Sequence, residues 1–460
     1  MAQRALSRRV FLRSLVAVSA AGLLGACAPA PQPTPTPKPA EAPKPAATPT
    51  PAPQPTPTPA PATPTPAPKP AQPTPTPTPV AQAKPVGRPN VIKMVSSLPR
   101  TGPSKGQTDT IVNAYKMALE EINYQIGQFK IEYEDWDDAT AAAGKWTADK
   151  EAENANKAVA DPDVMVYHGT YNSGAAAVAI PILNRANLVM VSPANTWPGL
   201  TKPGNWEPGE PDKYYPTGKR NYCRVVPADD LQGRAGALWA KELGAQKVYI
   251  LDDNELYGKG LATIFNRSAK ELGLQVLGQE SIDPKAPDYR TLATKIKGLG
   301  PDLVYFGGIE DNNAAKLWQD LRATLGPNVK LMGPDGIATT NFIKTAGQAA
   351  QGTYVTFGGL PLEAYKGKAL EWLQRYREKY KGDPDVYAIY GYEAMKVAID
   401  GIKRAGVKDR DAIRAAVMGT KDFDGVLGKW SFTETGDTTL TTMSGMIIEG
   451  DKFKFVKQIG

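Results

Sequence analysis

From residue 91 onward the chain alternates short apolar segments with segments of helical period, and this alternation limits the fold more than any other feature. Residues 163–201 show it most clearly. Two apolar runs, 164–167 and 188–191, have the length and composition of buried strands, and 175–183 has the apolar content of a helix between them. Repeated strand–helix–strand units predict a parallel sheet that is covered by helices on both faces.

Small and polar residues follow both of these strands. Ser173 stands just before the helix, where we expect its hydroxyl to cap the first turn, and Asn195 and Thr196 stand in the turn after the second strand. The carboxyl ends of neighbouring parallel strands meet at one edge of a sheet, where hydroxyls and free helix N–H groups bind anions. The pattern therefore indicates an anion site. The alternative is that Ser173 and Thr196 are ordinary turn and cap residues.

The same periods account for the rest of the folded region. Further strands are expected at 91–96, 129–133, 223–227, 247–251, 275–280, 303–306, 330–333 and 446–448. Helices are expected at 111–122, around Trp146, and at 232–243, 261–272, 289–297, 313–325, 364–380, 387–405 and 410–418, with a long surface loop at 202–221. We interpret these segments as two α/β lobes: 89–227 with 359–431 form the N-terminal lobe, and 228–358 with 432–460 form the C-terminal lobe.

The first 27 residues differ from all of this. A basic start containing Arg8 and Arg9 leads into an apolar stretch that ends at Leu24-Gly25-Ala26-Cys27. The segment resembles a bacterial lipoprotein signal with a twin-arginine start, which implies that Cys27 becomes the lipidated first residue and that Cys223 is a lone thiol. The alternative, a transmembrane helix, is disfavoured because the uncharged run after Arg13 is only about 13 residues, short of the roughly 18 to 20 needed.

Residues 28–88 consist mostly of Pro, Thr, Ala and Lys, with repeats such as PTPTP. Such a segment cannot bury a core, and we expect a disordered spacer in extended polyproline II, about 3.1 Å per residue and on the order of 190 Å in all. The formal net charge of +7 includes charges of the leader and the spacer. It therefore gives no reason to expect nucleic-acid binding.

Eight short motifs occur in a characteristic order along the folded region. They are TGP at 101–103, ALEEIN at 118–123, Asp137-Asp138, GTYNSGAA at 169–176, SPANTWPGLT at 192–201, Tyr257-Gly258, VYFGG at 304–308 and MGPDG at 332–336. Through them the region from about residue 90 to 460 resembles the type I periplasmic-binding-protein family, similar to the leucine/isoleucine/valine-binding substrate receptors of ABC transporters. The resemblance implies two Rossmann-like lobes joined by a hinge.

The resemblance also implies a ligand site between the lobes. In that family the carboxylate of an amino acid is held by the residue matching Ser173 and by the turn matching Asn195 and Thr196. Its ammonium meets an acid at the position of Asp335 and a tyrosine at that of Tyr257. Without the resemblance, Tyr257 could be an exposed ring in a Tyr-Gly turn, and Asp335 a turn residue needed for its backbone alone.

Several departures from the family leave the side-chain pocket open. Glu310 stands where an aromatic residue is common, Asn172 where a cysteine is common, and residues 104–106 offer no aromatic ring. Trp197 could supply an apolar wall or could be a surface-packed ring. Our hypothesis is that Glu310 beside Asp335 favours a ligand with extra N–H donors, such as an amide, a urea or a basic amino acid.

The sequence gives little support to an enzyme. Its one histidine, His168, lies on an apolar strand and is expected to be a satisfied core or edge histidine, so no His-based triad or His-rich metal set exists. Nucleotide loops and a Gly-x-Ser-x-Gly elbow are absent. The adjacent acids Asp137-Asp138 and Asp252-Asp253 are expected to be solvated turn residues. We predict no catalytic residue, no metal and no cofactor.

These features predict an extracytoplasmic solute-binding receptor of an ABC importer. It would capture a branched-chain type amino acid, or a related amide or urea-like solute, and deliver it to a membrane permease. We expect a monomer that is exported and lipid-anchored on the outer face of the bacterial cytoplasmic membrane. Two alternatives stay open: a ligand-sensing domain for a signalling partner, and an enzyme on the same fold.

Overall fold

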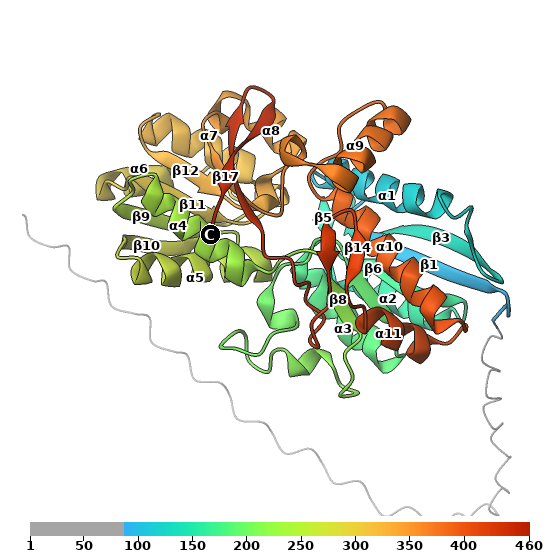
Figure 1. Ribbon diagram of the computed structural model, residues 1–460. Coiled ribbons are helices and arrows are strands. Elements are labelled where there is room, and N and C mark those ends of the chain that lie inside the picture. Colours follow the sequence, from blue (N-terminus) through green and yellow to red (C-terminus); the bar gives the residue numbers. More distant parts are fainter. Residues whose placement is uncertain (1–86) are drawn as a thin grey trace, which may run out of the picture. The chain divides into compact units, whose positions relative to one another are not determined.

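The computed structural model describes residues 87–460. The predicted signal segment with Cys27, and the spacer up to residue 86, lie outside the described residues. Within residues 87–460, no helix combines the length and the apolar character needed to cross a bilayer. The described residues contain two large sheets, each accompanied by helices (Figure 1).

The first sheet carries the two strand-end turns of interest. Its strand order is β2-β3-β1-β6-β7-β8, and neighbouring strands are parallel except β2 and β3. The strands are β1 Val91–Leu98, β2 Gln125–Ile126, β3 Phe129–Asp137, β6 Val164–Gly169, β7 Val189–Ser192 and β8 Tyr222–Arg224. Every residue of β6 and β7 is buried, as expected for central strands of a sheet covered on both faces.

The second sheet has the order β10-β9-β11-β12-β13-β16-β17. Its strands are β9 Lys247–Asp252, β10 Gln275–Ser281, β11 Leu303–Gly307, β12 Lys330–Gly333, β13 Tyr354–Gly358, β16 Met443–Glu449 and β17 Lys452–Gln458. The first five in this order are mutually parallel, whereas β16 and β17 are added antiparallel. The C-terminal strands therefore return to the second sheet.

Amphipathic helices accompany both sheets. In α1, Ile111, Tyr115 and Ala118 recur at steps of four and three residues, and all three are buried. We call the first sheet with helices α1–α3 and α9–α11 the first lobe, and the second sheet with α4–α8 the second lobe. The helices are α1 Lys105–Glu120, α2 Ala148–Ala160, α3 Ser173–Arg185, α4 Asp229–Glu242, α5 Leu256–Glu271, α6 Arg290–Leu299, α7 Ala314–Leu325, α8 Thr340–Ala346, α9 Gly367–Tyr380, α10 Ala388–Ala405 and α11 Arg410–Met418.

The chain passes between the lobes at 225–228, 359–366 and 431–442, which we call the crossing segments. Two small hairpins are separate from both large sheets. They are β4 Ala139–Thr140 with β5 Lys145–Trp146, and β14 Phe423–Gly425 with β15 Gly428–Trp430. The predicted fold class, two α/β lobes with late segments that return to them, is confirmed. The residue boundaries given above for the lobes stay predictions.

Two local expectations were wrong. Trp146 lies in strand β5, and the helix after it begins only at Ala148, where Thr147 caps it by accepting the N–H of Lys150. His168 is buried in the core as expected, but it is not satisfied: neither ring nitrogen has a hydrogen-bond partner among residues 87–460. Burial lowers the pKa of His168 to about 3, so the ring is neutral.

Three of the four adjacent acids, Asp138, Asp252 and Asp253, are buried instead of solvated, whereas Asp137 is partly exposed. Asp253 accepts the backbone N–H groups of Glu255 and Ile309 and the side-chain amide of Asn312. Burial raises its pKa to about 7. Asp138 is fully buried, and burial followed by the charge of Glu151 raises its pKa well above the ordinary value. Sequence adjacency alone therefore did not reveal which acids the fold would enclose.

Candidate functional site

The two strand-end turns of the first lobe are joined through Ser173. Its hydroxyl oxygen accepts the backbone N–H groups of Thr196 (3.3 Å) and Trp197 (3.2 Å). The expected cap is wrong: Asn172 occupies the capping position of α3, and no side chain caps this helix. The Ser173 hydroxyl is directed across to the neighbouring turn. The free N–H groups at the start of α3 therefore stay available beside Ser173 and Thr196.

Asn195 holds the second turn from within. Its side-chain amide donates to the backbone oxygen of Tyr171 (3.0 Å) and to the hydroxyl of Thr170 (3.2 Å). Its backbone N–H donates to the hydroxyl of Ser192 (2.9 Å). These bonds use the Asn195 side chain to fix the turn.

A buried arginine lies beneath the same turn. Arg224, the last residue of β8, donates to the backbone oxygen of Trp197 (2.7 Å) and to the hydroxyl of Thr201 (2.5 Å), and pairs with Asp437 at 2.8 Å. It is completely buried. Sequence reasoning missed it, although a lone Arg between apolar residues near the start of the predicted strand 223–227 was a usable signal. These contacts support the shape of the turn.

Asp335 is the centre of the second lobe's part of the site. It begins the short 3-10 helix η4 Asp335–Ile337, which follows β12 directly. Its carboxylate accepts hydrogen bonds from the hydroxyls of Tyr257 (2.7 Å) and Tyr387 and from the side-chain amide of Gln232 (2.5 Å). Burial raises the pKa of Asp335, and these three hydrogen bonds oppose the rise. The alternative that Asp335 is a turn residue needed for its backbone alone does not account for these side-chain hydrogen bonds.

Tyr257 lies in the first turn of α5, with its ring buried. Besides donating to Asp335, its hydroxyl accepts the backbone N–H of Gly336 at 3.2 Å. The alternative of an exposed ring in a turn is thereby ruled out. Tyr257 and Asp335 are 78 residues apart in the sequence. They meet because β9, β11 and β12, which precede or separate them in the chain, are neighbours in one parallel sheet.

Tyr387 was not predicted. It stands immediately before α10, a helix of the first lobe, and so its hydrogen bond to Asp335 crosses between the lobes. Its ring packs edge-on against Tyr171, with centroids 6.1 Å apart. Its backbone N–H donates to Gln107, whose amide in turn donates to the Tyr171 hydroxyl (2.8 Å). Nothing in the local pattern around Tyr387 distinguished it from the other tyrosines of this helix.

These groups meet around one small cavity of about 20 Å³, which has room for about one water molecule. Ser173 and Thr196 reach it from the first lobe, and Tyr257 and Asp335 reach it from the second. The lobes are therefore shut in this structure. The wall is formed by Tyr171, Asn172, Ser173, Ala194, Thr196, Tyr257, Ile309, Asp335, Gly336 and Tyr387.

Three predicted residues, Asn195, Glu310 and Trp197, do not belong to this wall. Glu310 is buried just behind Ile309: one of its oxygens accepts from Thr339 (2.7 Å), and the other has no hydrogen-bond partner in the described part of the chain. Burial raises the pKa of Glu310 to about 8.

The Trp197 ring points to a different place. It packs edge-on against Trp206, with centroids 5.4 Å apart, and its N–H donates to Glu210 at 2.9 Å. Together with residues of α5 it lines a separate cavity of about 120 Å³. A side chain on Gly260 of α5 would overlap the Trp197 ring, which shows how closely the two pack. Loop 202–221 therefore packs on Trp197, which in turn contacts α5 of the second lobe, and it is not purely a surface loop.

A charged contact closes the mouth between the lobes. The ammonium of Lys145, in β5, lies 2.6 Å from both Glu255 and the Asn312 side-chain oxygen of the second lobe. The neighbouring Trp146 ring N–H donates to the same Glu255 at 3.1 Å. On the same side, Ser104 donates its backbone N–H to Asp311 at 3.1 Å. These contacts exist only when the lobes are together.

Metal chemistry has no obvious place in this arrangement. Within the described residues, no group of three or more His, Cys, Asp or Glu side chains is arranged to hold a metal ion. The remaining cysteine there, Cys223, is buried in the first lobe. What the cavity offers is hydrogen-bond donors from one lobe and an acid with two phenols around it.

The chain is similar to known binding proteins over nearly all of its folded region. The family model described as periplasmic binding protein matches residues 91–452. The Leu/Ile/Val-binding protein BraC3 of Rhizobium johnstonii is 30% identical over 353 residues, which are 75% of this chain and 88% of that protein. The leucine-, isoleucine-, valine-, threonine-, and alanine-binding protein of Pseudomonas aeruginosa is 26% identical over 351 residues, covering 76% and 87%. A crystal structure of the leucine binding protein LivK from Thermotoga maritima has a TM-score of 0.71 at 25% identity, covering 80% of this chain and 99% of that one.

Proposed function

Because this chain belongs to the periplasmic binding protein family, we propose that it is the solute receptor of an ABC importer and closes its lobes over an amino acid or a related amide. Its relatives are binding proteins and not enzymes. The observation that carries the proposal is the meeting of Ser173 and Thr196 with Tyr257 and Asp335 at one cavity. Donors on one side and an acid on the other suit a zwitterion.

The first lobe would hold the carboxylate. The start of α3 offers N–H groups without an internal partner, and the dipole of this helix favours an anion there. The hydroxyls of Ser173 and Thr196 stand at the same place. Because Ser173 uses its lone pairs to accept from Thr196 and Trp197, its own proton can be donated to the ligand.

The second lobe would hold the ammonium. Asp335 is buried and has no cation beside it among its hydrogen-bond partners, which are two tyrosines and a glutamine. A buried carboxylate gains most from a partner that carries positive charge. The Tyr257 hydroxyl would orient Asp335 toward that partner.

Lobe closure follows because the carboxylate and the ammonium of the ligand would be held by different lobes. A ligand that touches both lobes binds the closed arrangement more tightly than the open one, and so shifts the population toward closure. The contacts of Lys145 and Trp146 with Glu255 add to the closed form from the rim. The closed form would then be what a membrane permease recognises.

We further propose that the ligand's side chain is polar. The Asn172 amide lines the cavity and makes no hydrogen bond to any residue in 87–460, and its oxygen is buried. The purely aliphatic side chains of the wall are only Ala194 and Ile309. A carboxamide or urea group would satisfy the Asn172 oxygen, whereas a branched aliphatic group would leave it unpaired, at a cost of about 1–3 kcal/mol.

The remaining part of the proposal concerns location. We propose that the protein is exported as a monomer and is tethered by lipid on Cys27 to the outer face of the cytoplasmic membrane. Metabolic labelling with a radioactive fatty acid tests this: the wild-type chain should be labelled, and a Cys27→Ala chain should not. Equal labelling of both would remove the anchor from the proposal.

Calorimetric titration of the purified full chain tests the binding function. Asparagine and leucine have nearly the same shape, and we expect asparagine to bind more tightly. N-acetylasparagine, which lacks the ammonium, and asparaginamide, which lacks the carboxylate, serve as matched controls and should both bind weakly. Tighter binding of leucine would reject the polar side chain but keep the receptor, whereas the absence of binding by any α-amino acid or amide would reject the zwitterion site itself.

A further inference from the structure

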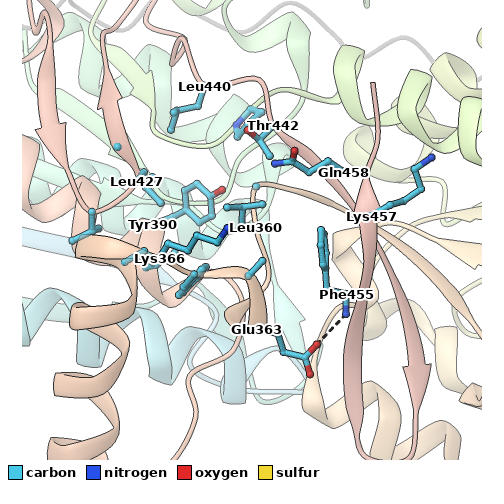
Figure 2. A pocket seen from close by; sticks show the side chains of 18 residues that line it. Leu360, Glu363, Lys366, Tyr390, Leu427, Leu440, Thr442, Phe455, Lys457 and Gln458 are labelled. Atoms are coloured by element: carbon cyan, nitrogen blue, oxygen red, sulfur yellow. Dashed lines mark hydrogen bonds between the residues drawn. The ribbon is translucent and has the colours of Figure 1, made fainter.

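A second cavity, of about 760 Å³, lies at the crossing segments and outside the candidate site (Figure 2). Each crossing segment contributes to its wall, with Pro227, Gly359 and Leu440 among the lining residues. Helix α10 lines it from the first lobe, and strand β17 lines it from the second. Its volume falls in the range of about 300–1,000 Å³ that is usual for small-molecule pockets. We call it the hinge cavity.

The hinge cavity is walled mainly by apolar groups. Figure 2 shows leucine side chains gathered around the Tyr390 ring, with Phe455 of β17 on the facing side. Aliphatic and aromatic walls of this kind bind a ligand through the apolar area that both remove from water. The apolar residues labelled in this view are Leu360, Leu427, Leu440, Tyr390 and Phe455.

One cation in this wall has no counter-charge. Lys366 extends toward Leu360 and Tyr390 in Figure 2 and forms no ion pair or hydrogen bond with another residue of 87–460. The other lysine of the wall, Lys457, is turned away and pairs with Glu242 at 2.6 Å. The hydroxyl of Tyr365 in the same wall is buried and lacks a hydrogen-bond partner within the described residues. The free cation of this wall is thus the Lys366 ammonium.

The acid in the same wall is already engaged. Glu363 accepts the backbone N–H of Phe455 at 3.2 Å, the contact drawn as a dashed line in Figure 2. This bond ties the second crossing segment to β17. It leaves Lys366 as the group that an incoming charge would meet.

We propose that the hinge cavity binds a small amphiphilic carboxylate. Its aromatic or alkyl body lies among the leucines and against Tyr390 and Phe455, and its carboxylate pairs with Lys366. This site is separate from the one proposed for the transported solute and does not depend on it.

The hinge cavity is connected to the candidate site through one turn of α10. Tyr387, at the start of that turn, bonds Asp335, and Tyr390 donates to the backbone oxygen of Gly358 at 2.5 Å. Both rings pack against Phe357, with centroids 5.6 and 6.0 Å away. A ligand on Tyr390 therefore contacts the aromatic cluster that joins the crossing segment to Asp335. Because it touches both lobes, it would bind their open and closed arrangements with different affinity and so change solute affinity.

Calorimetry with 3-phenylpropionate tests the proposal on the purified full chain. We expect one carboxylate to bind per chain, and we expect a Kd for the cleft solute that changes by at least about threefold when the carboxylate is saturating. The matched probes 3-phenylpropylammonium and 3-phenyl-1-propanol have the same body without the negative charge and should bind at least about tenfold more weakly. Equal binding of the three probes, or no binding of the carboxylate, would overturn the proposal.

Two variants locate the binding. Lys366→Met keeps the length of the side chain and should weaken carboxylate binding at least about tenfold, whereas Lys344→Met, an exposed lysine of α8 outside the cavity wall, should not. Ser173→Ala should retain carboxylate binding, because Ser173 is not in the wall of the hinge cavity. A carboxylate held at the anion end of the cleft would instead be lost in that variant. Wild-type affinity in Lys366→Met, or loss in Ser173→Ala, would place the carboxylate elsewhere and refute the hinge site.

Discussion

Removing the Asp335 carboxylate is the sharpest perturbation of the candidate site. The residue is 3% exposed, and its oxygens accept from Tyr257, Tyr387 and Gln232. A ligand ammonium in the cleft would lose its acidic partner in Asp335→Ala. Truncating one member of a buried, hydrogen-bonded charge pair costs about 2–5 kcal/mol of binding free energy. This cost corresponds to a rise in Kd of about 30- to 5,000-fold.

The variant Asp335→Asn separates charge from shape. Asparagine keeps the volume and one carbonyl acceptor for the Tyr257 hydroxyl, but it carries no charge. Hydrogen bonds to charged groups contribute about 1.5–3 kcal/mol, so we expect a loss near the lower end of the range for alanine. Asp451→Asn, an exposed carboxylate in the turn between β16 and β17, is the matched control and should bind like the wild type.

The assay is calorimetric titration of the wild type and these variants with the tightest-binding amino acid or amide, together with thermal melts of each protein. The melts identify any variant that is not folded. A folded Asp335→Ala protein with the wild-type Kd would remove Asp335 from the site. The proposal that the second lobe binds the ammonium would then fail, whatever the first lobe does.

Other perturbations address closure, pH and packing. Lys145→Met removes the charged contact at the mouth and should weaken the binding free energy of the solute by about 0.2–1 kcal/mol. High salt, about 1 M, should abolish the difference from the wild type, and no difference at low salt would show that this contact does not favour closure. Burial raises the pKa of Glu151 from its ordinary value of 4.5 to about 8, so the folded chain holds a proton that the unfolded chain releases above about pH 4.5. The stability of the wild type should therefore fall as the pH rises from 4.5 to 8. The melting temperature of Glu151→Gln should depend less on pH over that range, and identical pH profiles for the two proteins would contradict this. Gly260→Ala places a methyl group 2.1 Å from the Trp197 ring and should cost about 1–3 kcal/mol of unfolding free energy, whereas Gly298→Ala, with open space around it, should cost nothing in denaturant melts.

The order of strands and helices could be predicted because each element has its own period in the sequence. Segments such as 164–167 and 188–191 became β6 and β7 within two residues. The family resemblance carried by the eight motifs, and the prediction of a binding protein instead of an enzyme, are confirmed by the relatives. The ligand contacts of Ser173, Thr196, Tyr257 and Asp335 stay predictions, although the fold brings the four residues to one cavity.

What escaped prediction depends on distant parts of the chain. Tyr387 reaches Asp335 from a helix of the other lobe, 52 residues away, and Gln232 reaches it across 103 residues. Ser173 looked like a cap because its own helix was the only partner visible in the local sequence, yet the turn of the next strand supplies two N–H groups. Asp138 looked solvated because adjacent acids usually are, yet the folded chain buries it completely. Hydrogen-bonding partners of polar side chains are a tertiary property.

The phenol that bonds Asp335 from the first lobe has a consequence for selectivity. Tyr387 is a tethered competitor: it is covalently part of the molecule, and its hydroxyl already donates to the acid that a dissolved neutral donor would have to reach. A passing alcohol or water offers the acid nothing that Tyr387 does not already give. If Asp335 binds the solute's ammonium as proposed, a positively charged solute gains a charge–charge contact that Tyr387 does not give, and uncharged solutes would bind more weakly.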